Sequence, residues 1–417
     1  MANTNLNATP TANRFTIGLF GRRNTGKSSL INALTGQPVA VTSAVAGTTT
    51  DPVYKAMEIL PIGPAVFIDT AGLDDIDDEL GQLRIEKTYA VMRKCNLALV
   101  VAEAASGLGA FEMELLSQLQ ERQIPCIGVL NKCDQGMPEA QERAQIQQSL
   151  NNIPLVYTST TQGTGIDALK QQIIASATRL TDADQKEAPL VADLVKAGDR
   201  VVLVTPIDAA APKGRLILPQ QQTIREIIDR HAIAIVTQPL ALPQTLASLL
   251  EPPTLVITDS QAFHSVAADT PEAIPLTSFS ILYARQKGDL VEMVRGVRRI
   301  ERLVPDARVL IAEGCTHHRQ SDDIGSVKIP RWIREIAGDG IQFAWSSGSG
   351  YPENLAEYDL IVHCGGCMLN CQEMQYRIRQ ALAAGVRITN YGVLIAYVMG
   401  ILPRVLQPFP DACLALA

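Results

Sequence analysis

One short stretch near the N-terminus constrains the fold more than any other part of the sequence. The apolar segment Phe15 to Phe20 runs directly into Gly21-Arg-Arg-Asn-Thr-Gly26-Lys27-Ser28-Ser29, and the helix-forming Leu30-Ile31-Asn32-Ala33-Leu34 follows at once. This is a G-x-x-x-x-G-K-S loop between a strand and a helix, which is the context in which such a loop binds phosphates. We therefore predict a P-loop nucleotide-binding domain rather than a chance glycine-rich turn.

The residue types in this loop suit a nucleoside triphosphate. Glycines let backbone N–H groups curl around phosphate oxygens, Lys27 brings a cation to the β- and γ-phosphates, and Ser28 offers its hydroxyl to Mg²⁺. The dipole of the helix that follows favours the same anion. The predicted nucleotide-binding residues of this segment are Gly21, Asn24, Thr25, Gly26, Lys27, Ser28 and Ser29.

Two further segments carry the residues that a GTPase uses around Mg²⁺ and the γ-phosphate. Thr48 and Thr49 lie in a loop, where Thr49 can complete the Mg²⁺ shell. A predicted hairpin, Lys55 to Leu60 and Ala65 to Ile68, ends at Asp69-Thr-Ala-Gly72, whose carboxylate can hold Mg²⁺ through water. The predicted catalytic residues are Lys27, Thr49, Asp69 and Gly72.

Base recognition is predicted from two strand ends further along the chain. The strand Pro125 to Leu130 leads to Asn131-Lys132-Cys133-Asp134, and the Asp134 carboxylate can accept two N–H groups of guanine that adenine lacks. The strand Leu155 to Tyr157 leads to Thr158-Ser159-Thr160, where a backbone N–H can meet the guanine carbonyl. With Asn131, Lys132, Ser159 and Thr160 as further contacts, the sequence predicts GTP as the nucleotide.

A second group of chemically active residues lies in the C-terminal third. Cys315-Thr-His317 and His363-Cys364-Gly-Gly-Cys367 bring thiols and imidazoles together in a way that an apolar core does not need. A tetrahedral zinc site or a redox pair is compatible with this spacing. Three cysteines also fit a 4Fe-4S cluster that leaves one iron open to an exchangeable ligand. Both halves follow predicted strands, Arg308 to Ile311 and Tyr358 to Val362, and open parallel sheets bind ligands there.

Length and composition narrow the class of protein. With 417 residues the chain exceeds a single core, and we expect three α/β units, at residues 12–180, 187–265 and 270–417. An apolar content of 47% with a net charge of −7 indicates a soluble protein and argues against nucleic acid as the main partner. The longest apolar run, Val393 to Leu402, is too short for a membrane span, and no signal peptide is visible, so we expect a cytoplasmic protein.

The first domain resembles the translation-factor-type GTPases of the Era and tRNA-modification class, across residues 12–180. The resemblance implies a Ras-like α/β domain. Asn24 occupies the position that this class uses to bind K⁺, and Leu73 stands where Ras-like proteins carry a catalytic glutamine. The resemblance therefore implies slow, potassium-stimulated GTP hydrolysis.

Downstream of that domain, the paired cysteine motifs resemble the HydF family, the FeFe-hydrogenase maturation GTPases. Three other stretches resemble it too: Ala211-Pro-Lys-Gly-Arg-Leu-Ile-Leu-Pro219, Cys364-Gly-Gly-Cys-Met-Leu-Asn370 and Thr389-Asn-Tyr-Gly392. The resemblance implies a homodimer formed by the middle domain and a 4Fe-4S cluster held by the third. It also implies a scaffold that receives a di-iron subcluster precursor, works with radical-SAM maturases and supplies apo FeFe-hydrogenase.

By matching motif positions, Cys315, Cys364 and Cys367 become the cluster thiolates. His317 and His363 then act either as a fourth ligand or as groups beside the ligands, whereas His318 and Cys371 fall outside the pattern. Two other functions remain as alternatives: a ribosome- or RNA-associated GTPase with a structural zinc domain, and a cluster enzyme such as a dehydratase. The acidic composition weighs against the first, and the lack of an obvious substrate base weighs against the second.

Overall fold

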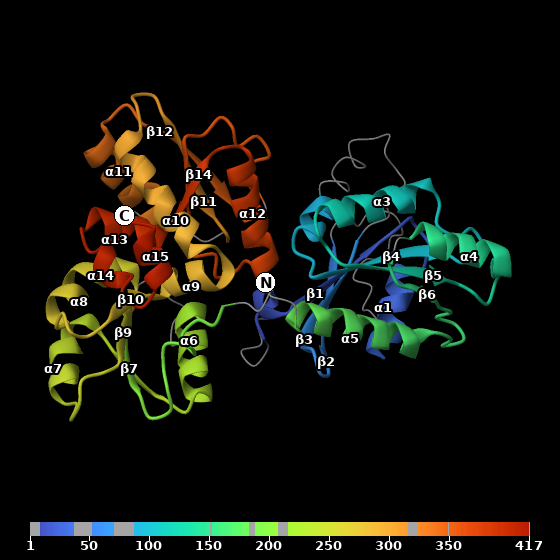
Figure 1. The fold of residues 1–417 in the computed structure, drawn as a ribbon, viewed down its shortest axis with the longest axis horizontal. Coiled ribbons are helices and arrows are strands. Elements are labelled where there is room, and N and C mark those ends of the chain that lie inside the picture. Colours follow the sequence, from blue (N-terminus) through green and yellow to red (C-terminus); the bar gives the residue numbers. More distant parts are fainter. Residues whose placement is uncertain are drawn as a thin grey trace. The chain divides into compact units, whose positions relative to one another are not determined.

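Alternation of apolar strands with helices produces two compact units, Met1–Lys186 and Glu187–Ala417 (Figure 1). The structure is a computed structural model and describes residues 9–36, 52–70, 87–150, 152–182, 188–206, 216–315, 323–348 and 350–416. Within these residues, no helix has the length and apolar content needed to cross a bilayer. Each unit is described by itself below.

The first unit is built on a six-stranded sheet with the order β2-β3-β1-β4-β5-β6. Only β2 is antiparallel to its neighbour, β3. The strands are β1 (Phe15–Phe20), β2 (Val53–Ile59), β3 (Gly63–Asp69), β4 (Leu97–Glu103), β5 (Cys126–Asn131) and β6 (Leu155–Tyr157). The predicted hairpin is confirmed, and so are the strands before the P-loop, the Asn131 motif and the Thr158 loop.

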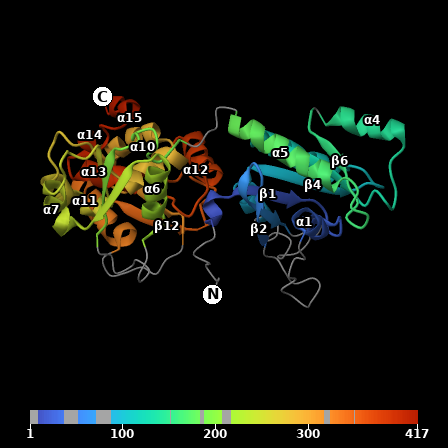
Figure 2. The same cartoon turned by 90° about the horizontal axis from the view of Figure 1, so that it is seen from below.

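Helices cover both faces of this sheet and bury its central strands. Apolar residues of α1 and α5 pack on one face, and those of α3 pack on the other. Figure 1 shows α3 and α5 on opposite sides of the strands, and Figure 2 shows α5 lying across them. The helices are η1 (Thr11–Asn13), α1 (Lys27–Thr35), α3 (Ala110–Glu121), α4 (Ala140–Ser149) and α5 (Ile166–Asp182).

The second unit contains two parallel four-stranded sheets with a shared apolar core. Counted along the whole chain, these are the second and third sheets. The second sheet has the order β10-β9-β7-β8, from β7 (Arg200–Val204), β8 (Ile233–Thr237), β9 (Leu255–Thr258) and β10 (Leu276–Ser278). The third has the order β12-β11-β13-β14, from β11 (Arg308–Glu313), β12 (Gln342–Ser347), β13 (Leu360–His363) and β14 (Arg387–Asn390). The boundary that we place between residues 265 and 270 stays a prediction.

The helices of the second unit are mostly short. They are α6 (Leu218–Asp229), η2 (Pro239–Ala241), α7 (Leu242–Ala247), η3 (Ser260–Ala262), α8 (Phe263–Asp269), α9 (Phe279–Lys287), α10 (Leu290–Val297), η4 (Arg298–Arg302), η5 (Ile324–Lys328), α11 (Ile329–Ala337), α12 (Cys371–Ala383), α13 (Tyr391–Val398), α14 (Leu402–Val405) and α15 (Pro410–Leu414). After the second cysteine motif the sequence predicts a helix from about Cys371 to Ala383, and α12 confirms it.

The sequence from Lys287 to Leu303 predicts one long helix, and the structure shows that this prediction is wrong. Helix α9 ends at Lys287, because Gly288 adopts a non-helical backbone conformation. Asp289 then caps a new helix, α10, by accepting a hydrogen bond from the Glu292 backbone N–H at 2.9 Å. This break separates α9, which packs against α12 and α13, from α10, which packs against β14.

Candidate functional site

The P-loop joins β1 to α1 in a backbone conformation that two glycines permit. Gly26 has φ +89°, and a Cβ atom there would lie 2.4 Å from the Asn131 side-chain nitrogen. At Gly21, with φ +144°, a Cβ would lie 2.1 Å from the Val101 carbonyl oxygen. Larger residues at these two positions would therefore displace the loop from β4 or from the Asn131 loop.

Lys27 is held at the centre of this loop. Its side chain is buried, and Nζ donates hydrogen bonds to the carbonyl oxygens of Gly21 at 2.9 Å and Arg22 at 2.7 Å. Thr25 Oγ1 also donates to the Arg22 carbonyl, at 3.1 Å. Asn24 has a positive φ of 63°, and Ser29 lies exposed in the first turn of α1. The loop thus positions one ammonium group beside the N-terminus of a helix.

Asp69, the last residue of β3, supplies a carboxylate next to the P-loop. The Ser28 hydroxyl donates a hydrogen bond to Asp69 Oδ2, while Oδ1 is buried without a hydrogen-bond partner among the described residues. Burial raises the pKa of the Asp69 carboxyl, and the Ser28 hydrogen bond and the Lys27 charge oppose that rise. A buried carboxylate oxygen without a partner beside a serine hydroxyl is a donor set that fits Mg²⁺ and its water shell.

Asn131 connects the P-loop to the strand ends that carry the predicted base-binding residues. Its side chain is buried, with Nδ2 donating to the Thr25 carbonyl at 3.0 Å and Oδ1 accepting from Thr158 Oγ1 at 3.1 Å. Lys132 has a positive φ of 61° and forms an ion pair with Glu103. These contacts hold the loops after β1, β5 and β6 together.

Asp134 lies exposed at the end of this arrangement. Its Oδ2 accepts a hydrogen bond from Thr161 Oγ1 at 2.9 Å, and the Thr161 and Ser159 hydroxyls lie 2.9 Å apart. Hydrogen bonds from Ser159 and Thr161 lower the pKa of the Asp134 carboxyl. Thr160 begins the turn between them. An ionised, solvent-facing carboxylate can accept two N–H groups of a planar base.

Several predicted residues lie outside the described part of the chain. They are Thr48, Thr49, Gly72, Leu73, His317 and His318.

The three predicted cluster cysteines follow two neighbouring strands of the third sheet. Strands β11 and β13 are parallel, with Ala312 opposite His363, so Cys315 and Cys364 emerge at the same edge. The Cys364 backbone N–H donates to the Ala312 carbonyl at 2.8 Å. Cys367 follows three residues later in the same loop. The prediction that both motifs lie at the carboxyl ends of strands is confirmed.

Backbone N–H groups and neighbouring thiols surround these sulfurs. The N–H groups of Gly314 and Gly366 donate to Cys364 Sγ, at 3.1 and 3.4 Å. Burial, together with the nearby Cys364 and Cys367 thiols and the Glu313 carboxylate, raises the pKa of the Cys315 thiol to about 12. Burial likewise raises the pKa of Cys364 to about 11. The three thiols are therefore close enough to affect one another's ionisation.

Lys287 approaches the same loop from the end of α9. Its buried Nζ donates to the carbonyl oxygens of Cys367 at 3.1 Å and Leu369 at 2.7 Å. Burial raises the pKa of the Cys367 thiol, and the charge of Lys287 opposes that rise. A fixed cation beside buried thiols stabilises a negatively charged group bound there.

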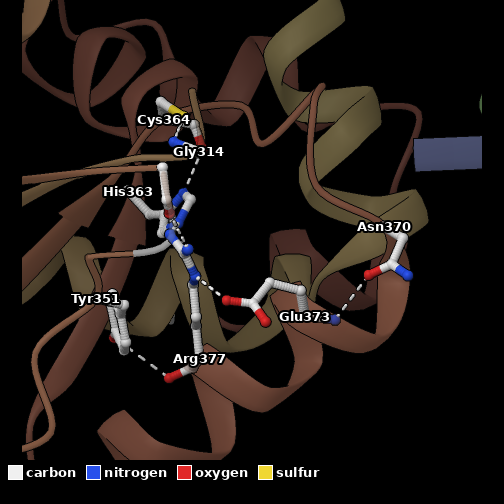
Figure 3. A network of polar contacts seen from close by, with 8 residues as sticks. Gly314, Tyr351, His363, Cys364, Asn370, Glu373 and Arg377 are labelled. Carbon is white, nitrogen blue, oxygen red and sulfur yellow. Dashed lines mark hydrogen bonds and ion pairs between the residues drawn. The ribbon is translucent and has the colours of Figure 1, made fainter. Parts of the chain in front are cut away.

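His363 is completely buried behind the cysteines (Figure 3). Its Nδ1 lies 2.8 Å from the Cys364 carbonyl oxygen, and its Nε2 lies 3.0 Å from Arg377 Nη1. Because a guanidinium only donates, Nε2 accepts and Nδ1 carries the proton that Cys364 O accepts. Burial and the Arg377 charge lower the pKa of His363 to about 3. Because both ring nitrogens form hydrogen bonds within the protein, the geometry of His363 suits a residue that supports the cluster ligands rather than one that binds iron itself.

Arg377 on α12 forms the centre of this buried network. Its Nε donates to Glu373 at 3.0 Å, and its Nη2 donates to the Gly348 carbonyl at 2.6 Å. The Tyr351 ring lies 4.8 Å from the Arg377 guanidinium carbon. Sequence analysis missed Arg377, Glu373 and Lys287, because nothing local to α9 or α12 marks these charges as buried.

The cysteine site meets the requirements of a multi-iron cluster better than those of a single metal ion. Among the described residues, no group of three or more Cys, His, Asp or Glu side chains is arranged to hold a single metal ion. A 4Fe-4S cluster differs from a single ion, because each thiolate binds a different iron atom. Three partly buried thiols with N–H donors and a cation nearby are a donor set that fits such a cluster.

Comparisons with known proteins cover both units. A profile for the 50S ribosome-binding GTPase family matches residues 16–132. The tRNA modification GTPase MnmE of Symbiobacterium thermophilum is 35% identical over 177 residues, which are 41% of this chain and 38% of that protein. MnmE of Thiobacillus denitrificans is 34% identical over 39% of this chain and 34% of its own length. The chain thus spans well under half the length of these relatives.

Among solved structures, Aquifex aeolicus Era bound to GDP·AlF4⁻ matches with a TM-score of 0.36 and 20% identity, over 53% of this chain and 91% of that one.

The second unit matches a hydrogen maturase F dimerization domain at residues 190–288 and a hydrogen maturase F tetramerization domain at residues 291–408. The fold and the first profile define a chain with a Ras-like P-loop GTPase domain followed by further α/β domains. With both maturase domains present beside it, the chain belongs to the HydF family of hydrogenase-maturation GTPases.

These matches confirm two of the predictions from sequence. The family is the one that the paired cysteine motifs resemble, and the fold class is the predicted one. The dimerization and tetramerization domains support self-association of the chain.

Proposed function

We propose that this protein is a GTP-hydrolysing scaffold that binds a 4Fe-4S cluster and delivers the di-iron subcluster precursor to apo FeFe-hydrogenase. The observation that carries the proposal is the meeting of Cys315, Cys364 and Cys367 at one edge of the third sheet, with N–H groups directed at Cys364 Sγ. These cysteines would hold the cluster, which would offer one iron without a thiolate for exchange of ligands. His317 and His363 would act beside it.

The chain's own residues give this site its shape and charge. Lys287 fixes the loop through two carbonyl groups and brings a positive charge to Cys367. His363, locked by Arg377, holds the Cys364 carbonyl in place. The three cysteines are partly buried, so a bound cluster would be partly shielded from water while one side stays open to exchange. The di-iron precursor is cargo, and we propose that it arrives from radical-SAM maturases.

In the first unit we propose that the P-loop binds the phosphates of GTP and that Ser28, Thr49 and water on Asp69 complete the Mg²⁺ shell. Lys27 would stabilise charge that develops on the transferred phosphoryl group, and the Gly72 N–H would sense the γ-phosphate. Asp134 would select guanine, supported by its low pKa and exposed position. The self-associating form is proposed to be a homodimer.

Potassium should accelerate this hydrolysis. Asn24 lies in the P-loop with a positive φ of 63°, and a cation bound beside it would offset phosphate charge. We expect turnover in KCl to exceed turnover in NaCl at equal ionic strength, and Asn24→Ala to remove the difference. The steady-state release of phosphate measures both, and equal rates of the unaltered chain in the two salts would remove K⁺ from the mechanism.

The cluster assignment is tested by single cysteine substitutions after anaerobic reconstitution with iron and sulfide. Cys364→Ala should lose most bound iron and its visible absorption, while GTP hydrolysis persists because the nucleotide residues lie in the other unit. Cys413→Ala is the matched control, a half-buried thiol of the same unit whose Sγ donates to the Leu406 carbonyl at 3.2 Å. It should keep its iron.

Two outcomes would reject the assignment. Full iron content in Cys364→Ala would exclude that thiolate as a ligand. Stoichiometric zinc without iron in the unaltered chain would favour the alternative of an RNA-associated GTPase with a structural metal domain.

A further inference from the structure

Five arginines line one surface cavity of about 550 Å³ in the second unit. We call this cavity the arginine pocket; its arginines are Arg295, Arg298, Arg299, Arg302 and Arg387. They come from α10, η4 and the first residue of β14. The pocket lies at the amino ends of β13 and β14, whereas Cys364 follows the carboxyl end of β13. The pocket and the cysteines therefore lie at opposite ends of the strands of the third sheet.

Positive charge in the arginine pocket exceeds the negative charge that faces it. Glu292 accepts hydrogen bonds from both Arg295 and Arg387. Asp359 pairs with Arg299 at 3.3 Å and also accepts from the Arg308 backbone N–H at 3.0 Å. Among the described residues, the five guanidinium groups thus pair with two carboxylates, which leaves a surplus of three positive charges in a chain whose net charge is −7.

The surplus is concentrated on η4. Arg298 Nη1 donates to the Leu416 carbonyl at 3.1 Å, a neutral partner. Arg302 is exposed and makes no ion pair within the described part of the chain. Glu301 on the same helix does not line the pocket, and its carboxylate accepts from the Tyr397 hydroxyl. These two arginines are therefore available to a ligand without breaking an internal ion pair.

The lining also restricts what the ligand is. A guanidinium presents parallel N–H groups that match phosphate or carboxylate oxygens, and the volume is that of a small-molecule site. Tyr358 is buried, and the Arg308 guanidinium carbon lies 5.2 Å from its ring centre, so Arg308 covers one face of the aromatic ring in the described lining. The remaining walls are small residues such as Ala356, Ala384 and Ala415.

We propose that the arginine pocket binds a compact oxyanion with three or more negative charges. Clustered phosphates and a tricarboxylate share this chemistry. Binding at the pocket is independent of the nucleotide and cluster functions proposed above, since none of those residues lines it.

Calorimetric titration of the full chain with tripolyphosphate and, separately, with citrate tests the proposal. All samples carry Lys27→Ala, which weakens any binding of phosphates to the P-loop, and ionic strength is held constant with KCl. The test variant adds Arg298→Ala and Arg302→Ala, which leave both carboxylate pairs intact. The control instead adds Arg225→Ala and Arg331→Ala, exposed arginines of the same unit that pair within their own helices.

We expect one anion to bind with a stoichiometry of one per chain, at least tenfold more weakly in the test variant and unchanged in the control. Tighter binding of tripolyphosphate than of citrate identifies a phosphate site, and tighter binding of citrate identifies a carboxylate site. Equal affinity in all three proteins would overturn the proposal. So would an absence of binding accompanied by a change of oligomeric state in the test variant by sedimentation, because a second copy of the chain would then cover the pocket.

Discussion

Replacement of Lys27 by alanine is expected to abolish GTP hydrolysis. The Lys27 ammonium is buried in the P-loop, where it donates to two loop carbonyls and opposes the rise in pKa that burial causes at the adjacent Asp69 carboxyl. The described P-loop contains no second cation in this position. Loss of one charged group that faces a transferring phosphoryl group costs a factor of at least about a hundred in rate.

Phosphate release under single-turnover conditions measures this loss directly. Lys170→Ala is the matched control, because Lys170 is a half-exposed lysine of the same unit whose ion pair among the described residues is with Asp167, at 3.8 Å. The control should hydrolyse GTP at the original rate. Iron content after reconstitution should be the same in both variants, since the cysteines belong to the other compact unit. Hydrolysis by Lys27→Ala within a few-fold of the original rate would contradict the assigned role.

Local sequence was sufficient to predict the first sheet and the ends of its strands. The P-loop and the Asn131 motif combine an apolar strand with turn-forming residues in adjacent positions, so neighbouring residues alone determine them. The same holds for β11 and β13, whose carboxyl ends meet because both strands are parallel.

Contacts between distant segments explain what the sequence analysis missed. Strand β12 (Gln342–Ser347) alternates weakly between exposed and half-buried residues, so no clear period of two marks it. The split between α9 and α10 depends on Gly288, against which the side chain of Ile378 from α12 packs. The buried Arg377 pairs with His363, fourteen residues earlier, and the arginine pocket assembles four segments that lie far apart in the chain.

The network around Arg377 predicts a large effect on stability. Arg377 and Glu373 are 1% and 2% exposed, so removal of the arginine leaves a buried carboxylate without its cation. It also removes the donor to His363 Nε2. Breaking such a buried ion pair costs about 3–5 kcal/mol. We therefore expect Arg377→Met to destabilise the second unit by that amount, because methionine retains the apolar part of the side chain but not the charge.

Tryptophan fluorescence during urea unfolding measures this change in the right unit, because the two tryptophans of the chain, Trp332 and Trp345, both belong to it. Arg379→Met is the matched control, an exposed arginine two residues further along α12 whose loss should change the free energy of unfolding by under about 0.5 kcal/mol. Adding Glu373→Gln to Arg377→Met removes the unpaired charge and should recover part of the lost stability. If the double variant is less stable than Arg377→Met alone, an unpaired Glu373 carboxylate is not the source of the cost, and the network holds the fold by packing of the guanidinium against Tyr351 instead.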